Sequence, residues 1–377
     1  MIFWIITNLL FSLGYLLLFA WFGKGWKNLS ETRTTRKIAN HKTFTVLIPV
    51  RNEEEHIVRL LQSIKDQKYP KDKFEVLLIN DSSEDNTEVV VAEFIRKNPE
   101  LSLQMFHLRN QGKTGKKEAL NFGVEKAHFS NIITVDGDCC VPPRWLQAYH
   151  HKLQERKHHF VSGPIAYFES NNFFKNCLDI ECKGLVTIGG ASIQNKKPNL
   201  CNGANLMFTK EAFCRVNGYQ GNQHLASGDD EFLLQKMVAL GTEGIGFLRN
   251  PEAIVKTQAP KNFKEFYYQR KRWVSKSRHY KNPKLTLLLG MLYLYYFFLV
   301  LSFCFSLSEP MLLIIALCFL FTKALIEYRY LYLLNFFSFR RLFPTVLLAQ
   351  PFYILYVLLI GILGNWGTFV WKGRVRK

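Results

Sequence analysis

Three stretches of this sequence contain no Asp, Glu, Lys or Arg, and each is long enough to cross a lipid bilayer. They cover residues 2–23, 285–308 and 342–371. A helix needs roughly 20 apolar residues to span the hydrocarbon core, where the backbone must satisfy its own hydrogen bonds. A fourth apolar run, residues 311–322, is short and spans only if it continues past Lys323. The pattern predicts a membrane protein with a water-exposed middle region.

Basic residues beside the apolar stretches indicate the orientation, because Lys and Arg stay on the cytoplasmic side of a membrane. The first cluster consists of Lys24, Lys27, Arg33, Arg36, Lys37 and Lys42. The second consists of Lys261, Lys264, Arg270, Lys271, Arg272, Lys276, Arg278, Lys281 and Lys284. We expect a multi-pass protein of the inner (plasma) membrane, with the N-terminus outside and the middle region in the cytoplasm.

The first apolar stretch and the basic C-terminal residues bear on the membrane topology. The first stretch is a poor signal peptide, because nothing basic precedes Ile2 and no small-x-small cleavage site follows it. Three crossings after a cytoplasmic domain would put the basic residues at 372–377 outside, against the charge rule. Either the 311–322 run is not a simple span, or residues 328–343 lie in the interface, or the last stretch is re-entrant. We expect two or three C-terminal spans, with Lys323 and Glu327 paired at the interface.

The net charge of +19 and the isoelectric point of about 9.5 indicate anionic partners. Nucleic acid, an anionic membrane surface and phosphorylated substrates all qualify. The basic residues gather beside the apolar stretches, which the membrane orientation explains, and the sequence contains no nucleic-acid-binding motif. We therefore expect membrane lipids as partners, and no nucleic acid.

The middle region alternates predicted strands with predicted helices. Residues 44–50 are apolar on both faces, as in a buried parallel sheet, and residues 74–79 and 132–135 are further apolar runs of strand length. Residues 57–64 carry apolar side chains at helical spacing. This alternation predicts βαβ units and an α/β fold. The expected division is a transmembrane helix (1–23), a basic linker (24–43), an α/β domain (44–260), an interfacial segment (261–284) and a C-terminal transmembrane region (285–377).

Polar residues follow three of the predicted strands, at the edge where parallel sheets bind ligands. Asn52 and Asp81 follow the first two strands, and Asp136-Gly137-Asp138 follows residues 132–135. Two carboxylates around one glycine suit a divalent cation held against a diphosphate, although Asp-Gly is also common in turns. The absence of G-x-G-x-x-G and Walker A sequences argues against dinucleotide and P-loop sites.

Eight cysteines and two histidine pairs carry no metal-site spacing. We expect the cysteines to be free thiols, because most belong to a region placed in the reducing cytoplasm. We expect His150-His151 and His158-His159 to be solvated surface residues.

Taken together and in order, the motifs resemble those of family 2 glycosyltransferases, over roughly residues 44–284. The matching segments are Val46–Glu53, Ile79–Ser83 with Asp85 and Thr87, Asp136–Asp138, Ser227–Glu231, and the Gln-x-x-Arg-Trp motif of membrane-bound members at Gln269–Trp273. The resemblance implies a glycosyltransferase-A domain, which is a Rossmann-like nucleotide-diphospho-sugar transferase fold, flanked by transmembrane helices. It also implies an inverting reaction.

The resemblance assigns donor-side roles to residues near the strand ends. Asp138 would ligate Mg²⁺ or Mn²⁺ on the diphosphate, and Asp136 would lie against the ribose, the metal or the sugar. Asp81 would hydrogen-bond the base or ribose of the nucleotide. The same pocket would be lined by Pro49, Asn52 and Glu53. A lysine of the basic loop, Lys116 or its neighbours Lys113 and Lys117, would reach the donor, although loop lysines are commonly solvated.

The acid run would supply the base that deprotonates the acceptor hydroxyl. Asp230 is the preferred base, with Asp229 and Glu231 as rivals, because a run of three acids cannot be resolved from sequence. Acids in the first turn of a helix also interact favourably with the helix dipole, which is the alternative reason for their presence.

The later motifs would bind the leaving group and the acceptor. Arg272 would meet the diphosphate, and Gln269 and Trp273 would contact the acceptor, although this segment also suits an interfacial helix. Asn205 is either an acceptor-side residue or part of a structural turn.

The sequence thus predicts an inverting glycosyltransferase that moves a sugar from a nucleotide-diphospho-sugar to a lipid-linked or glycan acceptor at the cytoplasmic membrane face. A processive polysaccharide synthase, which shares Gln-x-x-Arg-Trp, is the enzymatic alternative. A membrane-anchored module that binds anionic ligands is the non-enzymatic one.

Overall fold

The structure is a computed structural model that describes residues 2–34, 40–221, 227–276, 282–339, 341–364 and 369–376. The basic residues Arg36, Lys37, Arg278 and Lys281 of the two predicted clusters lie outside this part. The chain forms two compact units. We call Asn28–Phe168 with Leu185–Ala259 the sheet unit, and Met1–Lys27, Glu169–Gly184 and Pro260–Lys377 the helical unit.

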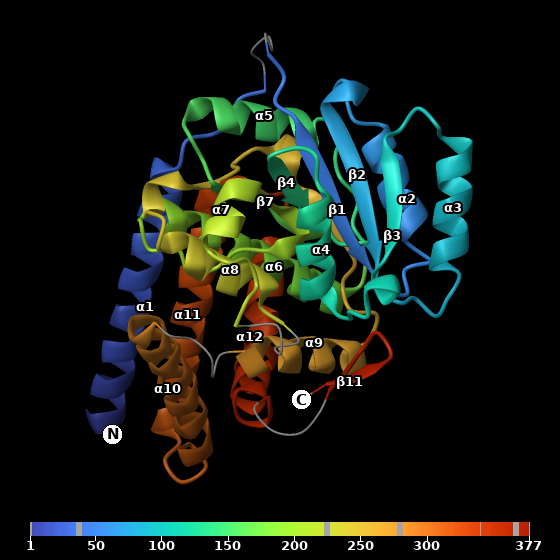
Figure 1. Ribbon diagram of the computed structural model, residues 1–377. Coiled ribbons are helices and arrows are strands. Elements are labelled where there is room, and N and C mark those ends of the chain that lie inside the picture. Colours follow the sequence, from blue (N-terminus) through green and yellow to red (C-terminus); the bar gives the residue numbers. More distant parts are fainter. Residues whose placement is uncertain are drawn as a thin grey trace. The chain divides into compact units, whose positions relative to one another are not determined.

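The sheet unit is built on a seven-stranded sheet in the order β3-β2-β1-β4-β7-β5-β8 (Figure 1). Its strands are β1 (Phe44–Val50), β2 (Phe74–Asn80), β3 (Leu103–His107), β4 (Asn131–Thr134), β5 (Phe160–Ser162), β7 (Leu206–Thr209) and β8 (Ile245–Phe247). The first four strands are parallel, and β7 runs antiparallel to both β4 and β5. A second sheet pairs β6 (Ile165–Tyr167) with β9 (Val255–Thr257) in parallel.

Helices cover both faces of the parallel half of the sheet, as predicted for βαβ units. The helix α4 (Lys116–Lys126) contacts β1 and β2 on one face, and α2 (Ile57–Lys65) and α3 (Thr87–Lys97) pack together on the other (Figure 1). Every residue of β2 is buried, which explains its continuous apolar sequence. The remaining helices are α5 (Trp145–Glu155), α7 (Lys210–Arg215) and α8 (Asp229–Val238).

The histidine pairs contradict the expectation of solvated side chains. His150, His151 and His158 are each at most 5% exposed. Burial lowers the pKa of His150 to about 4 and that of His158 to about 3, because a dry environment disfavours the charged ring. All eight cysteines are free, as expected.

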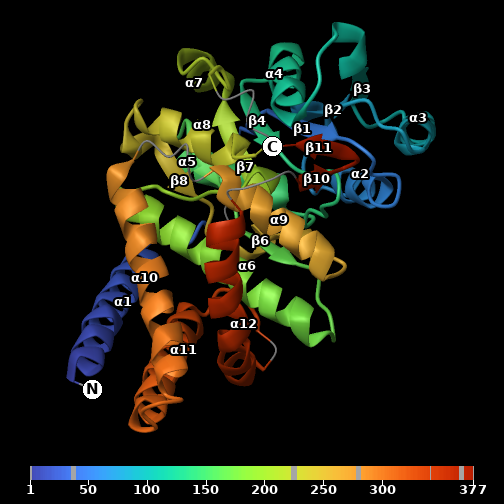
Figure 2. The same cartoon turned by 90° about the horizontal axis from the view of Figure 1, so that it is seen from below.

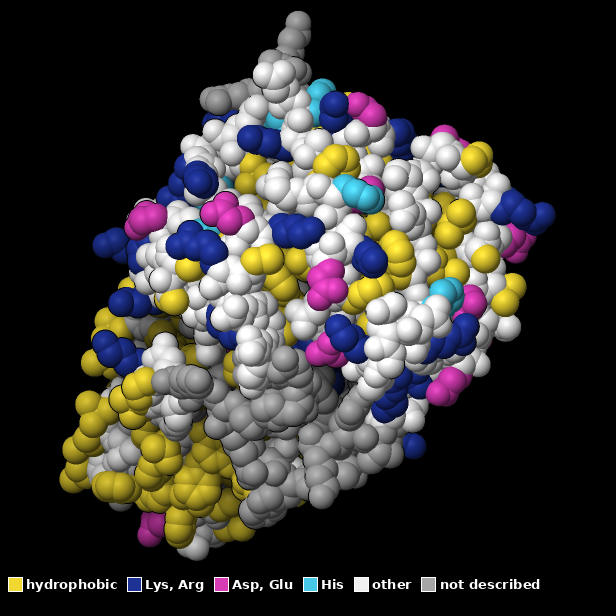
Figure 3. Space-filling view, viewed as in Figure 1, with side chains coloured by type: hydrophobic (Ala, Val, Ile, Leu, Met, Phe, Trp, Pro, Cys, Tyr) yellow, Lys and Arg dark blue, Asp and Glu magenta, His cyan; other side chains and the backbone are white. Residues whose placement is uncertain are grey.

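The helical unit contains four helices that are long and apolar enough to cross a membrane among the described residues. They are α1 (Ile2–Asn28), α10 (Pro283–Phe305), α11 (Met311–Leu334) and α12 (Leu342–Leu363), and α10, α11 and α12 contact one another (Figure 2). Apolar side chains cover the outer face of α1 and α10 (Figure 3). The unit also holds α9 (Phe263–Ser275), a hairpin of β10 (Phe369–Trp371) and β11 (Arg374–Arg376), and the first half of α6 (Phe173–Gln194).

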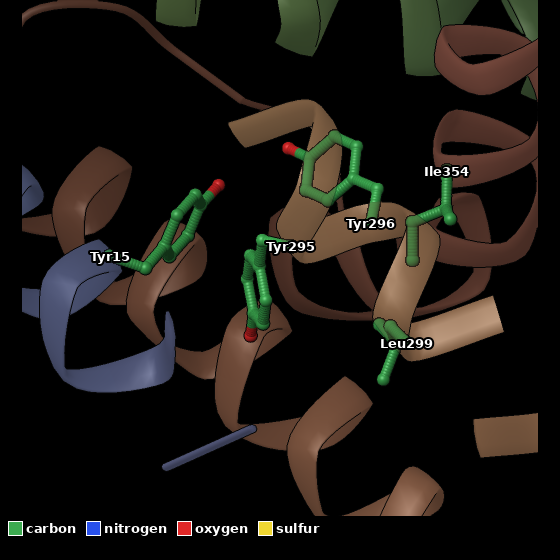
Figure 4. Close-up of a cluster of buried hydrophobic side chains, with 5 residues drawn as sticks. All are labelled: Tyr15, Tyr295, Tyr296, Leu299 and Ile354. Carbon is green, nitrogen blue, oxygen red and sulfur yellow. The ribbon is translucent and has the colours of Figure 1, made fainter. Parts of the chain in front are cut away.

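The helical unit is held together by aromatic packing and by buried polar contacts. Tyr15 of α1 packs with Tyr295 and Tyr296 of α10 and with Ile354 of α12 (Figure 4). Lys323 is fully buried near the middle of α11, where its Nζ lies 2.6 Å from oxygens of both Glu327 and Gln350. The expected pairing of Lys323 with Glu327 is therefore confirmed, and neighbouring helices enclose the two charges.

Candidate functional site

The loops that follow β1 and β2 are fastened to each other at the carboxyl edge of the sheet. Arg51 is buried, and its Nη1 donates to the Asp81 carbonyl oxygen at 2.9 Å. The Asn52 amide N–H donates to Ser83 Oγ at 3.1 Å, and Asn52 Oδ1 accepts from the Glu84 N–H at 2.8 Å. Neither loop can therefore move without the other.

Two residues in these loops have left-handed backbone conformations. Asn52 has φ 52° and Ser82 has φ 55°, a region that costs energy for residues other than glycine and that is found at functional sites. The hydrogen bonds of Asn52 just described hold that residue in place, and Arg51 Nη1 also donates to the Ser82 carbonyl oxygen. The polar residues predicted from the strand ends thus lie on a rigid rim.

Asp81 holds the basic glycine-containing loop against this rim. Its Oδ1 accepts hydrogen bonds from the Gly115 N–H at 2.9 Å and from the Thr114 hydroxyl at 3.2 Å. Gly115 has φ +103°, which a residue with a Cβ would adopt only with strain. The carboxylate that was assigned to the nucleotide therefore also sets the position of Lys116.

Lys116 joins two carboxylates that are far apart in the sequence. Its Nζ lies 2.7 Å from Asp136 Oδ1 and 3.3 Å from Asp229 Oδ2. Burial by itself would lower the pKa of Lys116, but the charges of Asp136, Asp229 and Asp230 outweigh it and raise the pKa above its ordinary value. The ammonium thus stays charged and links the end of β4 to the first turn of α8.

The acid run lies against this link. Asp230 accepts hydrogen bonds from the Gly203 N–H at 3.0 Å and from the Glu231 N–H at 2.8 Å. A Cβ at Gly203 would lie 3.2 Å from Asp229 Oδ2, so glycine allows the close approach. Glu231 is 5% exposed and Asp229 is 9% exposed, whereas Asp230 is more open. Asp230 is therefore the most solvent-accessible of the three acids.

Lys117, the next residue of α4, contacts the segment in which α8 begins. Its Nζ donates to the Ser227 carbonyl oxygen at 3.1 Å and lies 5.6 Å from the ring of Phe232. Adjacent lysines of α4 thus contact α8 in different ways. Lys116 meets the acids, and Lys117 holds the backbone that carries them.

Asp138 lies beyond the end of β4, between neutral donors. Thr257 Oγ1 donates to Asp138 Oδ2 at 3.2 Å, and the Cys139 thiol lies 3.6 Å from Oδ1. Burial, together with the nearby carboxylates, raises the pKa of Cys139 and keeps it a protonated donor. A Cβ at Gly137 would lie 3.0 Å from side-chain atoms of Glu53 and Val50. The absence of a Cβ at Gly137 therefore lets this segment pack closely against the loop after β1. Close packing is a structural reason for a glycine between Asp136 and Asp138.

The carboxylates suit a metal that is shared with a substrate. No group of three or more His, Cys, Asp or Glu side chains able to hold a metal occurs in the described part of the chain. Asp136 and Asp138 each supply hard oxygen atoms. Mg²⁺ and similar ions bind through one or two carboxylates when phosphates complete the coordination. The residues present therefore fit a cation that arrives with a diphosphate.

Asn205 has a structural role, which corrects its assignment to the acceptor side. The side chain is fully buried. Its Oδ1 accepts from Trp145 Nε1 at 2.9 Å and from the Tyr149 hydroxyl at 2.8 Å. Its amide donates to the carbonyl oxygens of Pro164 and Ala253 at 2.8 and 2.9 Å. With these four bonds the amide has no capacity left for a ligand.

The Gln-x-x-Arg-Trp motif lies on α9 in the helical unit. Gln269, Arg272 and Trp273 are all half-buried. The guanidinium of the intervening Arg270 lies 4.3 Å from the ring of Trp273. Trp273 therefore contacts a neighbour on its own helix.

Residues that the sequence analysis missed hold the predicted ones in place. Arg59 of α2 donates to the Asp138 carbonyl oxygen at 3.1 Å and lies 4.5 Å from the ring of Phe168. Thr257 donates to Asp138. Neither Arg59 nor Thr257 belongs to a recognisable motif, and only their positions in the folded chain reveal them.

Two family models match the chain. "Glycosyl transferase family 2" matches residues 45–213, and "Glycosyl transferase family group 2" matches residues 131–371. The chain is 27% identical to a "Probable glycosyltransferase" of Sulfolobus acidocaldarius over 251 residues, which is 63% of this chain and 50% of that protein. It is 29% identical to the "Probable glycosyltransferase YdaM" of Bacillus subtilis over 235 residues, which is 61% and 54% of the two chains. The chain thus spans about half the length of these curated relatives.

A solved structure shares the architecture. The mannosyltransferase PcManGT from Pyrobaculum calidifontis, in complex with GDP-Man and Mn²⁺, superposes with a TM-score of 0.59 at 19% identity. The match covers 96% of this chain and 99% of that one. At this identity the likeness establishes the fold.

Proposed function

The chain belongs to glycosyl transferase family group 2 and has a glycosyltransferase-A fold, and from this we propose that it transfers a sugar from a nucleotide-diphospho-sugar to an acceptor hydroxyl. One observation carries the proposal. Lys116 binds both Asp136, which follows β4, and Asp229, in the acid run. Residues with donor-side and base-side assignments, nearly a hundred positions apart, thereby share one site.

Donor binding would combine the rim of the sheet with a divalent cation. Asp138 and Asp136 would hold Mg²⁺ or Mn²⁺, which would supply Lewis-acid stabilisation of the diphosphate leaving group. The PcManGT complex with GDP-Man and Mn²⁺ supports this choice by analogy. Asp81, Asn52, Glu53 and Pro49 would line the nucleotide pocket. Lys116 and Arg272 would add positive charge for the leaving group.

The transfer itself would be one displacement with inversion. The acceptor oxygen forms a bond to the anomeric carbon while the bond from that carbon to the diphosphate oxygen breaks, and the nucleoside diphosphate departs. Asp230 takes the acceptor proton. Its hydrogen bonds from Gly203 and Glu231 hold the carboxylate in a fixed orientation, which favours its role over that of Asp229, whose charge is engaged by Lys116.

The acceptor would be a lipid-linked or glycan molecule at the cytoplasmic face of the inner (plasma) membrane. The helical unit carries 21 Lys and Arg against 6 Asp and Glu, so most of the net charge of +19 belongs to it. Such an excess beside long apolar helices fits an anionic membrane surface. Gln269 and Trp273 would contact the acceptor on this side.

The test uses the purified full-length chain and a panel of nucleotide-sugars. We expect one nucleotide-sugar to be hydrolysed slowly, with a requirement for Mg²⁺ or Mn²⁺, and we expect Asp138→Ala and Asp230→Asn to abolish turnover. Wild-type rates in both purified variants would reject the assignment. Calorimetry would show metal-dependent donor binding, which a module that binds by charge alone lacks. Product length on a gel would identify a processive synthase.

A further inference from the structure

Side chains from two helices of the helical unit meet at a carboxylate on a third. Arg270 of α9 forms an ion pair with Oε2 of Glu181 on α6. The Tyr356 hydroxyl of α12 donates to Oε1 of the same carboxylate. The side chains of Arg270 and Glu181 are 5% and 11% exposed. Both oxygens of Glu181 are thus engaged away from bulk water.

Aromatic rings enclose the guanidinium of Arg270. Its central carbon lies 4.3 Å from the ring of Trp273, 5.1 Å from that of Phe266 and 5.8 Å from that of Tyr356. A planar guanidinium can stack on rings and meet a carboxylate at the same time, whereas a lysine ammonium is a point charge. The surroundings therefore select arginine at this position.

We propose that Arg270, Glu181 and Tyr356 form a positioning triad that sets the rotation of α9, and so the direction in which Arg272 and Trp273 are presented for sugar transfer. The inference rests on the proposed function, because it concerns the motif assigned there to the diphosphate and the acceptor. It adds three residues for which the family motif predicts no such role.

Helix geometry relates the direction of Arg270 to those of Trp273 and Arg272. Successive residues turn by about 100°, so Trp273 lies about 60° from Arg270 and Arg272 lies about 200° from it. With Arg270 buried against α6 and α12, Arg272 must point to the opposite face of α9. Trp273 keeps one ring face against the guanidinium. Loss of the anchor would let the helix rotate and carry both side chains with it.

A buried ion pair adds little net stability, because desolvation offsets most of the attraction. Loss of the triad should therefore lower kcat, in addition to any change in melting temperature that a comparable buried ion pair also shows. A matched pair lies one half-turn away on α6, where Lys183 Nζ meets Asp179 Oδ2 at 2.5 Å and the Ser338 carbonyl oxygen at 2.9 Å. That pair is also largely buried, and Lys183 contacts the loop after α11.

The experiment compares Glu181→Gln, Arg270→Lys and Tyr356→Phe with the control Asp179→Asn, in the full-length chain. The measurements are the melting temperature and the kcat and KM for hydrolysis of the nucleotide-sugar identified above. We expect Glu181→Gln to lower kcat at least tenfold with little change in the donor KM, and Arg270→Lys and Tyr356→Phe to lower it less. We expect Asp179→Asn to keep kcat within twofold of wild type while it lowers the melting temperature about as much as Glu181→Gln does, because each change leaves a largely buried cation without its carboxylate.

The double variant Glu181→Gln/Arg270→Lys separates positioning from general damage. If the pair acts as a unit, the double variant loses no more kcat than the worse single variant. Additive losses, equal losses in Asp179→Asn, or full activity in Glu181→Gln would each overturn the inference. An active Asp138→Ala would reject the proposed function itself, so the two failures are distinguishable.

Discussion

Replacing Asn205 by alanine tests whether this residue belongs to the core or to the acceptor site. The substitution removes four hydrogen bonds of 2.8–2.9 Å and leaves the Trp145 indole N–H and the Tyr149 hydroxyl buried without this acceptor. Burial raises the pKa of Tyr149, so its hydroxyl stays protonated and needs an acceptor. Each bond contributes about 1 kcal/mol net, so the expected loss is about 4 kcal/mol or more.

A loss of this size is a large part of the stability of a typical domain, which is about 5–15 kcal/mol. In a unit of this size each kcal/mol shifts the melting temperature by about 2–4 °C, so we expect a drop of about 8–16 °C. The assay is thermal unfolding of the full-length protein in detergent, followed by near-ultraviolet circular dichroism. Because the protein has two units, the transition midpoint is compared and no two-state free energy is assumed.

A matched asparagine in the same unit serves as the control. Asn131 is half-buried, and its side-chain amide donates a hydrogen bond to the Thr43 carbonyl oxygen at 3.0 Å. Its replacement by alanine should lower the melting temperature by only a few degrees, about 2–4 °C for one bond. If Asn205→Ala melts like wild type and instead raises the KM for the acceptor, the structural role is refuted. Asn205 would then be assigned to acceptor binding.

Three further outcomes follow from the other charged groups. Lys116→Met should lower kcat about 100-fold at saturating Mn²⁺, the size expected when one preorganised donor to a leaving group is lost; steady-state hydrolysis of the donor checks this. Because burial lowers the pKa of His158 to about 3, the unfolded state binds more protons below pH 6.5, and His158 should cost about 2 kcal/mol of stability between pH 7 and pH 5. Melting at the two pH values should show a smaller difference in His158→Gln. Lys323→Met leaves Glu327 without its buried ammonium and should melt lower than the double variant Lys323→Met/Glu327→Gln; equal melting would contradict an ion pair in the bundle.

Local patterns in the sequence were sufficient for the elements and for the edge of the sheet that carries the site. The strand at residues 44–50 and the helix at residues 57–64 follow from apolar spacing alone, because that spacing records which side of an element is buried. The polar residues after β1, β2 and β4 lie at one edge because parallel strands share the direction in which they end. The apolar runs likewise predicted the membrane helices without any knowledge of their neighbours.

Other features depend on contacts between distant segments, and local patterns do not encode them. The sequence contains no signal for the reversal of β7, because a strand is equally apolar in either direction. Lys116 meets Asp229 only because α4 and α8 pack beside the same strand end. His150 resembles a surface residue in a polar stretch, yet the fold buries it.

The sequence by itself therefore determined the two kinds of region in this chain, the alternation of strands and helices over residues 44–135, and the acidic residues available for a site. Only the tertiary structure decided which of these residues share a charge, which of them are consumed by the core, as Asn205 is, and which unassigned residues, such as Arg270, hold the others. The physical reason is that sequence periodicity is local and reports which face of a single element is buried. A pair of charges or a fully hydrogen-bonded amide depends on how two or more elements, distant in the sequence, pack together.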